Sequence, residues 1–242
     1  ISSETTHFFS RTALMYIYMG HMDYKNTKPY EDWFWKKNRI DLIQDFVEKV
    51  DVVEKKLYLT GKGKLSYDTL IIAAGSKSNK FGWPGQDYKG VQGLYSYPDL
   101  LEMEENTKGI ERAVIVGGGL IGVEMAEMLR SRKIEVTFLI REDSFWSNVL
   151  PSQEAQMISR HIREHHVDLR EGTELQDILG DNQGRVRGVV TKQGEQIECQ
   201  FVGLTVGVSP NIGFLKSSGI DTQRGVLVNE YLQTNVKDVY AL

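Results

Sequence analysis

The feature that most constrains this sequence is a glycine-rich loop between an apolar run and a helical pattern. Residues 113–116, Ala-Val-Ile-Val, are short and β-branched enough to form a fully buried parallel strand. Residues 117–122 follow with glycine at the first, third and sixth positions and lead into a helical pattern that begins with Val123. A second apolar run occupies residues 136–140. Strand, glycine loop, helix and strand in this order predict a βαβ unit.

Each glycine of this loop has a physical role in such a unit. Gly117 permits a tight turn out of the strand. Gly119 lets the backbone approach a pyrophosphate closely, and Gly122 lets the helix lie against the strand. The helix then presents unpaired N–H groups and its positive dipole end to phosphates. The alternative is a turn that only packs a helix on a sheet, but the complete strand–helix–strand context favours a dinucleotide site.

Composition limits the other classes of function. A chain of 242 residues can hold one large or two modest domains, and a net charge of -4 without a long basic run gives no reason to expect nucleic-acid binding. The apolar stretch at residues 13–19 is too short to span a bilayer. The single Cys199 excludes an internal disulfide and favours a reducing cytoplasm. The first residue is not Met, so we expect an excised piece of a longer protein.

Local patterns predict the remaining elements. Helices are expected at residues 11–19, with Ser10 as the cap, and around 30–37, 97–105 and 151–166. Strands are expected at residues 50–53, 56–60, 64–70, 69–76, 167–170, 185–191, 196–199, 201–206, 226–228 and 239–242. The strand at 69–76 is expected to be buried, and its small residues Ala74 and Gly75 indicate either tight packing or the close approach of a ligand.

Taken together and in order, several segments resemble the pyridine-nucleotide-dependent flavoprotein oxidoreductases, the family of glutathione reductase, NADH oxidase and ferredoxin reductase. The matching segments are residues 67–76, 84–85, 90–91, 117–124, 206–211 and 234–242. The resemblance implies an α/β fold: a Rossmann-like three-layer dinucleotide-binding domain plus a partial second domain of the same type. It implies a partial FAD-binding domain at residues 1–104, an NAD(P)H-binding domain at 105–224, and a return to the FAD-binding domain at 225–242.

Departures from the family pattern are informative. The family's first glycine fingerprint, which holds FAD, and its closing Gly-Asp are both absent, so we expect the chain to be the middle of a flavoprotein. Arg11 stands where one branch of the family carries a redox cysteine. The resemblance therefore points to the branch without that cysteine, which passes electrons to an acceptor protein, a partner domain or a small acceptor. It leaves a homodimer open.

The resemblance also assigns candidate cofactor-binding residues. Leu120 and Ile121 would flank the nicotinamide pocket and Glu124 would lie near the nicotinamide, although Glu124 could instead be a solvated carboxylate near the helix start. Gly207 and Val208 would line the nicotinamide side, and Arg11 would face the flavin or lie on the surface. The full candidate set is Gly117, Gly118, Gly119, Leu120, Ile121, Gly122, Glu124, Arg141, Gly207, Val208, Arg11, Ala74 and Gly75.

The residues that bear on the choice between NAD and NADP point in different directions. Ile140 stands where NAD-dependent members usually carry Glu, and Arg141 matches the arginine that binds the 2′-phosphate in NADP-dependent glutathione reductase. Glu142 and Asp143 would repel that phosphate, and Gly122 is the NAD-type residue at its position. The hypothesis from sequence is dual specificity or a weak preference for NADPH.

Two classes of function follow. The first is a flavin-dependent NAD(P)H oxidoreductase, of which this chain is mainly the NAD(P)H-binding part, with FAD bound in the full-length parent. The second is a non-catalytic module that senses NAD(P)H or mediates an interaction. The pair His161 and His165 has metal-binding spacing, but without a third ligand a solvated helix face is the better interpretation, and Cys199 is expected to be an inert packed thiol.

Overall fold

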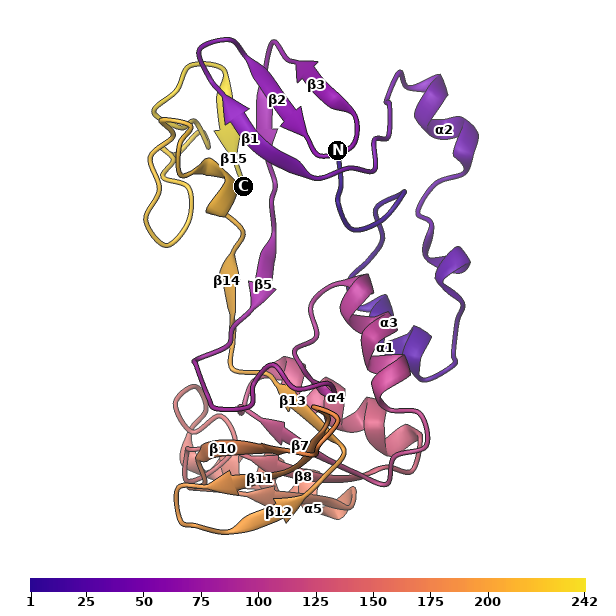
Figure 1. Cartoon of the computed structure of the whole chain (residues 1–242), viewed down its shortest axis with the longest axis vertical. Coiled ribbons are helices and arrows are strands. Elements are labelled where there is room, and N and C mark those ends of the chain that lie inside the picture. The colour runs from indigo at the N-terminus through magenta and orange to yellow at the C-terminus, as the bar shows by residue number, and fades with distance from the viewer. The chain divides into compact units, whose positions relative to one another are not determined.

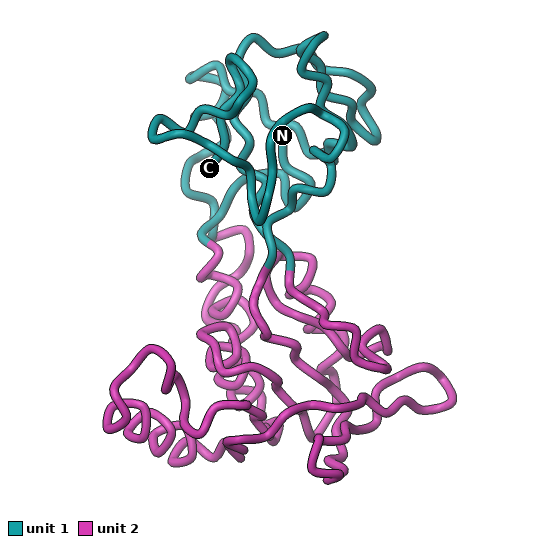
Figure 2. Tube along the Cα trace, turned by 90° about the vertical axis from the view of Figure 1, so that its left-hand side faces the viewer, with its two compact units in different colours: residues 1–10, 27–77, 209–242 teal, residues 11–26, 78–208 magenta.

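The computed structural model describes residues 1–242 and divides into two compact units (Figure 2). Unit 1 contains residues 1–10, 27–77 and 209–242, and unit 2 contains residues 11–26 and 78–208. The units are interleaved in sequence, because the chain leaves and re-enters each of them. The pair of short strands β5 (Ser76–Ser78) and β14 (Val208–Pro210) lies where the chain passes from one unit to the other.

Unit 2 is built on a five-stranded parallel sheet (Figure 1). Its order is β6 (Val91–Gln92), β13 (Phe201–Leu204), β7 (Arg112–Val116), β8 (Glu135–Leu139) and β9 (Val167–Arg170). Register pairs Gly203 with Ile115 and Ile115 with Phe138, so consecutive strand ends reach the same edge. Burial of the central strands on both faces explains their near-continuous apolar sequence.

Other elements cover the two faces of this sheet. The helices α4 (Leu120–Ser131) and α5 (Ser152–Glu164) pack on one face. On the other face lies the antiparallel sheet of β10 (Leu175–Gly180), β11 (Val186–Thr191) and β12 (Gln196–Glu198). Val114 and Val116 belong to the hydrophobic cluster shared with β10 and β11. The predicted three-layer dinucleotide-binding fold is confirmed.

The helices α1 (Ala13–Tyr18) and α3 (Tyr97–Asn106) join unit 2 at the C-terminal end of α4. Ser96 and Asp99 form a capping box that begins α3. The Tyr18 hydroxyl bonds Thr107 Oγ1 at 2.7 Å, and the Arg132 guanidinium donates to the Tyr18 carbonyl while it lies 3.5 Å from the Tyr18 ring centroid. The predicted Ser10 cap is wrong, because α1 begins at Ala13 and Thr12, two residues after Ser10, is its N-cap.

Unit 1 has its own core. The strands β1 (Val47–Asp51), β2 (Lys56–Leu59) and β3 (Gly63–Ser66) form an antiparallel sheet, and β4 (Leu70–Ile72) pairs in parallel with β15 (Val239–Ala241). The 3₁₀ turn η2 (Gly213–Leu215) adds Leu215 to this core. The short helix α2 (Asp32–Lys37) and the turn η1 (Tyr24–Thr27) complete the helical elements.

Some sequence expectations differ from the structure. The strand expected at 69–76 splits into β4 and β5, and Ile71 is 63% exposed, so the expectation of a buried strand is wrong there. Residues 226–228 form only an isolated bridge, between Val226 and Thr222. The strands β6, β10 and β14 had not been predicted.

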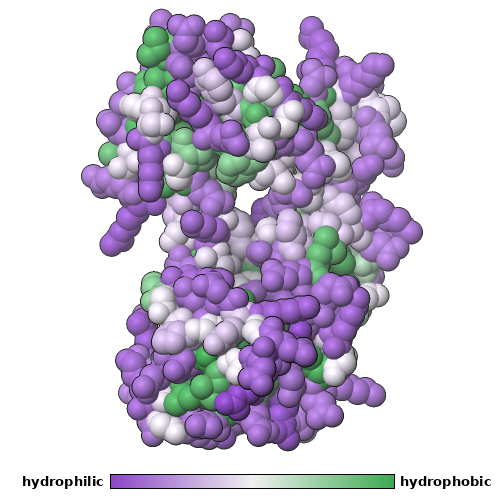
Figure 3. Space-filling view, in the orientation of Figure 1, coloured by the Kyte–Doolittle hydropathy of each residue, from purple (hydrophilic) through white to green (hydrophobic).

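The compact units also divide the chain at other points than the expected domains. Residues 78–104 pack in unit 2, where β6 pairs with β13. Residues 209–224 pack in unit 1, where Leu215 and Ile220 enter the core. None of the helices combines the length and the hydrophobicity that spanning a bilayer requires. On the face shown in Figure 3, hydrophilic residues predominate and hydrophobic ones form separate patches.

Candidate functional site

The glycine loop lies at the carboxyl end of β7 and leads into α4. Gly117 has a φ of +113°, and a Cβ there would lie 2.5 Å from the Thr205 carbonyl oxygen. At Gly122 a Cβ would lie 2.6 Å from the Gly117 carbonyl oxygen and 2.8 Å from Phe138 Cζ. Both glycines are therefore required by the fold, one for its conformation and one for the close packing of helix on strand.

Gly119 differs from these two neighbours. Its φ of -102° and ψ of 178° are open to any residue, and the nearest atom to a Cβ there would be the Thr205 carbonyl oxygen at 4.0 Å. It is the N-cap of α4, and its carbonyl accepts the Gly122 and Val123 N–H groups, whereas the first two N–H groups of a helix have no acceptor within it. The next residue, Leu120, is 62% exposed. The loop thus offers open space in front of a helix N-terminus, which suits a phosphate group.

Thr205 fastens this loop to the neighbouring strand β13. Its backbone N–H donates to the Val116 carbonyl at 2.8 Å, and its hydroxyl lies 3.0 Å from the carbonyl oxygens of both Val116 and Gly117. Sequence reasoning had missed this residue. The sequence analysis placed Thr205 inside the strand expected at 201–206, and a lone hydroxyl near the end of that apolar run was the available signal.

Gly207 and Val208 follow Thr205 on the same segment. Gly207 has a φ of +92°, and its carbonyl accepts the Asn79 N–H at 3.0 Å. The Asn79 amide nitrogen would be 3.4 Å from a Cβ at Gly207, and Val208 is 39% exposed. The structure therefore brings the segment that contains Gly207 beside the glycine loop, with Asn79 as a neighbour that sequence reasoning had not identified.

Arg141 and Glu142 follow β8 and form an ion pair. Arg141 Nε donates to Glu142 Oε1 at 2.9 Å, and the neighbouring carboxylate raises the pKa of Arg141 above its usual value. The Arg141 side chain is 75% exposed, whereas that of Glu142 is 23% exposed. Glu142 Oε2 would lie 3.7 Å from a Cβ at Gly118, so this carboxylate faces the glycine loop.

Ile121 and Glu124 lie in the first turns of α4 and are both partly buried. Burial raises the pKa of the Glu124 carboxyl above its usual value, and the charge of Glu127 adds to the effect. A carboxyl group with a raised pKa is one that can take part in proton transfer, although packing alone also produces such shifts.

Arg11, which the resemblance assigns to the flavin, and the candidate cofactor-binding residues Ala74 and Gly75 lie in different units. In unit 2, Arg11 lies 4.4 Å from the centroid of the Tyr95 ring and donates to the Tyr95 carbonyl. In unit 1, the Asn211 side chain donates to the Ala74 and Ser76 carbonyls, and the Asn211 N–H donates to the Gly75 carbonyl at 2.9 Å. Asn211 therefore fixes the backbone that carries Ala74 and Gly75, with Gly75 at a φ of +62°.

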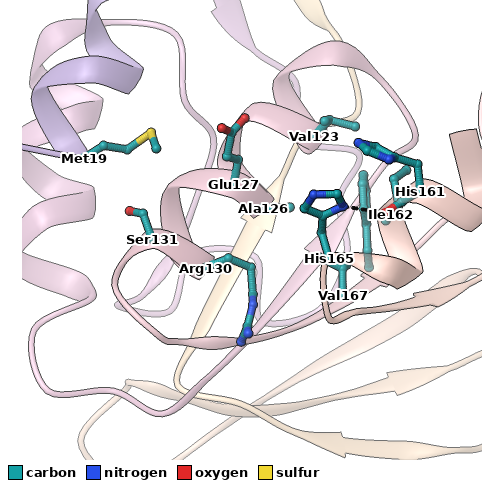
Figure 4. Close-up of a pocket in the computed structure, with 11 residues that line it drawn as sticks. Met19, Val123, Ala126, Glu127, Arg130, Ser131, His161, Ile162, His165 and Val167 are labelled. Atoms are coloured by element: carbon teal, nitrogen blue, oxygen red, sulfur yellow. Dashed lines mark hydrogen bonds between the residues drawn. The ribbon is translucent and has the colours of Figure 1, made fainter. Parts of the chain in front are cut away.

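His161 and His165 line a cavity of about 370 Å³ between α4 and α5 (Figure 4). Their rings lie 4.2 Å apart, and His165 Nδ1 bonds the His161 carbonyl oxygen at 2.9 Å. Both residues are exposed, and no group of three potential metal ligands exists in the chain. Cys199 is fully buried, and burial raises the pKa of its thiol to about 12, as expected for an inert thiol.

Comparisons with known proteins show which proteins this chain resembles. Nitrite reductase [NAD(P)H] of Bacillus subtilis is 30% identical over 237 residues, which are 97% of this chain and 29% of that protein. NADH-rubredoxin oxidoreductase of Clostridium acetobutylicum is 31% identical over 213 residues, 87% of this chain and 51% of that protein. The chain thus spans about half or less of the length of these relatives.

A solved structure supports the fold. The ferredoxin reductase of Rhodopseudomonas palustris aligns with a TM-score of 0.90 at 22% identity, over 99% of this chain and 59% of that one. The model of the pyridine nucleotide-disulphide oxidoreductase family matches residues 1–242. The chain therefore belongs to the pyridine nucleotide-disulphide oxidoreductase family.

Proposed function

We propose that this chain is mainly the NAD(P)H-binding part of a flavoprotein oxidoreductase. The whole protein would pass a hydride from NAD(P)H to FAD and then pass electrons to an acceptor. The observation that carries the proposal is the open space at Gly119 in front of the N-terminus of α4. Backbone N–H groups and the helix dipole would bind the pyrophosphate there.

The surrounding residues support the assignment of the nicotinamide side. Gly207 follows Thr205, and Thr205 is hydrogen bonded to the glycine loop, so the two segments are held together. The exposed Val208 and Leu120 would provide apolar contacts for the nicotinamide ring. Glu124, whose carboxyl pKa is raised by burial, would lie near that ring.

Arg11, which the resemblance assigns to the flavin, suits an anionic cofactor. Its side chain is an exposed cation of unit 2. FAD, when bound, would supply the redox chemistry, while the protein binds and orients the nicotinamide. The names of the relatives support a redox protein, such as the rubredoxin of the clostridial enzyme, as the class of acceptor.

The test is nucleotide binding to Gly119→Val, measured by calorimetry. A β-branched side chain would occupy the space for the pyrophosphate, so we expect the affinity to fall by at least about a hundredfold, or 2.8 kcal/mol. Gly213→Val is the control, because a Cβ there would also meet open space and the residue is outside unit 2. Undiminished binding by a folded Gly119→Val protein would exclude this loop as the nucleotide site.

A further inference from the structure

The end of strand β8 lacks the acidic residue that commonly binds the ribose in NAD sites. Ile140 occupies that place, and its Cγ2 would lie 3.2 Å from a Cβ at Gly118. An aliphatic side chain therefore packs directly on the glycine loop and can accept no hydrogen bond. If a carboxylate binds the ribose of a nucleotide held by this loop, a residue other than Ile140 must supply it.

The backbone after Ile140 directs Glu142 toward the loop. The Ile140 N–H donates to the Arg170 carbonyl at 3.0 Å, and the Ile140 carbonyl accepts the Thr173 N–H at 2.8 Å. The Glu142 carbonyl accepts the Gly172 N–H at 2.9 Å. These bonds hold residues 140–142 alongside residues 170–173, so the position of the Glu142 side chain follows from a fixed backbone.

The two oxygens of the Glu142 carboxylate face different partners. Oε1 accepts the Arg141 Nε–H, and Oε2 is the oxygen that faces Gly118, 3.7 Å from the position of a Cβ there. With only 23% of the side chain exposed, the carboxylate is a fixed feature of the loop's surroundings. Arg141 is 75% exposed and points its charge at Glu142.

We infer that Glu142 is the carboxylate that accepts the ribose hydroxyls of the adenosine half, and that the site selects NADH over NADPH. This inference rests on the proposed function. A ribose diol brings O–H donors to a carboxylate, whereas a 2′-phosphate brings negative charge and removes a donor. Arg141 is then a positioning residue for Glu142 and does not read the phosphate.

In the competing assignment, which the sequence had suggested, Arg141 binds the 2′-phosphate of NADPH. Arg141 would have to leave Glu142, which costs little because an exposed ion pair is weak. The Glu142 carboxylate would nevertheless remain beside the bound phosphate and repel it. The fixed Glu142 carboxylate, and not the exposed Arg141 guanidinium, therefore decides the preference between NADH and NADPH.

Calorimetric titration of the full-length protein with NADH and with NADPH separates these assignments. We expect NADH to bind at least about tenfold more tightly, since hydrogen bonds to a charged group contribute on this scale. Glu142→Gln should weaken NADH binding by about tenfold and leave NADPH binding unchanged or improved. Asp143→Asn is the matched control: the sequence had grouped Asp143 with Glu142, but its Oδ1 lies 4.0 Å from a Cβ at Gly172 and is not among the atoms nearest a Cβ at Gly118, so both affinities should stay unchanged.

Each other outcome is decisive. A wild-type preference for NADPH, or an unchanged ratio of affinities in Glu142→Gln, would overturn the role of Glu142. Arg141→Ala should weaken NADH binding modestly, and a selective loss of NADPH binding would restore the competing assignment. Failure of the wild-type protein to bind either nucleotide would instead refute the proposed function, and the inference with it.

Discussion

Replacing Gly122 with alanine tests the packing that places the nucleotide loop. The added Cβ would lie 2.6 Å from the Gly117 carbonyl oxygen, 2.8 Å from Phe138 Cζ and 2.9 Å from Thr205 Oγ1. None of these atoms can move freely. The first belongs to the backbone, Phe138 is fully buried, and the Thr205 hydroxyl is hydrogen bonded to the loop.

Two opposing effects set the change in the free energy of unfolding that Gly122→Ala causes. Alanine favours a helix interior over glycine by about 1 kcal/mol. Overpacking a buried site costs about 1–3 kcal/mol, and disturbing the Thr205 hydrogen bond costs about 1 kcal/mol more. We therefore expect a net loss of about 1–3 kcal/mol, which for unit 2 corresponds to a Tm lower by about 3–10 °C.

Thermal unfolding followed by circular dichroism measures this loss. Gly119→Ser is the matched control, since serine is a favoured N-cap residue and only the Thr205 carbonyl oxygen lies as close as 4.0 Å to a Cβ there. Its Tm should stay within about 2 °C of the wild-type value. An unchanged or higher Tm for Gly122→Ala would show that α4 does not pack on β8 as described.

Two further substitutions test hydrogen bonds in unit 2. Thr205→Val keeps the shape but removes the hydroxyl that bonds the Val116 and Gly117 carbonyls, so Tm should fall by about 2–4 °C; no change in the unfolding midpoint would show that the hydroxyl is not needed to hold the loop. Tyr18→Phe removes a buried bond to Thr107 and should cost about 1 kcal/mol in denaturant unfolding at pH 7. Burial raises the pKa of Tyr18, so the tyrosine loses its proton first in the unfolded state and the free energy of unfolding falls as the pH rises above about 10. This fall should be smaller in Tyr18→Phe. An identical pH profile for the two proteins would contradict the role of Tyr18 in it.

The sequence predicted the part of the fold that local patterns encode. The order of strand, glycine loop, helix and strand over residues 112–139 matches β7, α4 and β8, because glycines and apolar periodicity act over a few residues. The strand β9 was also found, at residues 167–170. The strands β6 and β10 were missed: β6 has only two residues, and β10 is stabilised by pairing with β11 and not by its own pattern.

In the candidate site too, local patterns revealed some features and contacts between distant residues determine the others. Glycine spacing identified the loop and assigned the tight turn to Gly117 and the helix packing to Gly122, and the contacts that a Cβ would meet at these two positions agree with those roles. The approach of a pyrophosphate to Gly119 stays a prediction, for which the structure offers open space. Thr205 and Asn211 act through contacts with residues far away in the sequence, at positions 116–117 and 74–76. The orientation of Glu142 depends on backbone bonds to the strand after α5, which no local pattern reveals.

The most direct test of the proposed function is an anaerobic titration of the full-length protein with NADH, followed by the visible absorbance of its flavin. We predict that one equivalent of NADH removes the absorbance of the oxidised flavin, and that Gly119→Val requires a large excess to do so because its nucleotide site is blocked. Binding of NADH that leaves the flavin absorbance unchanged would contradict the proposal and favour a sensing module.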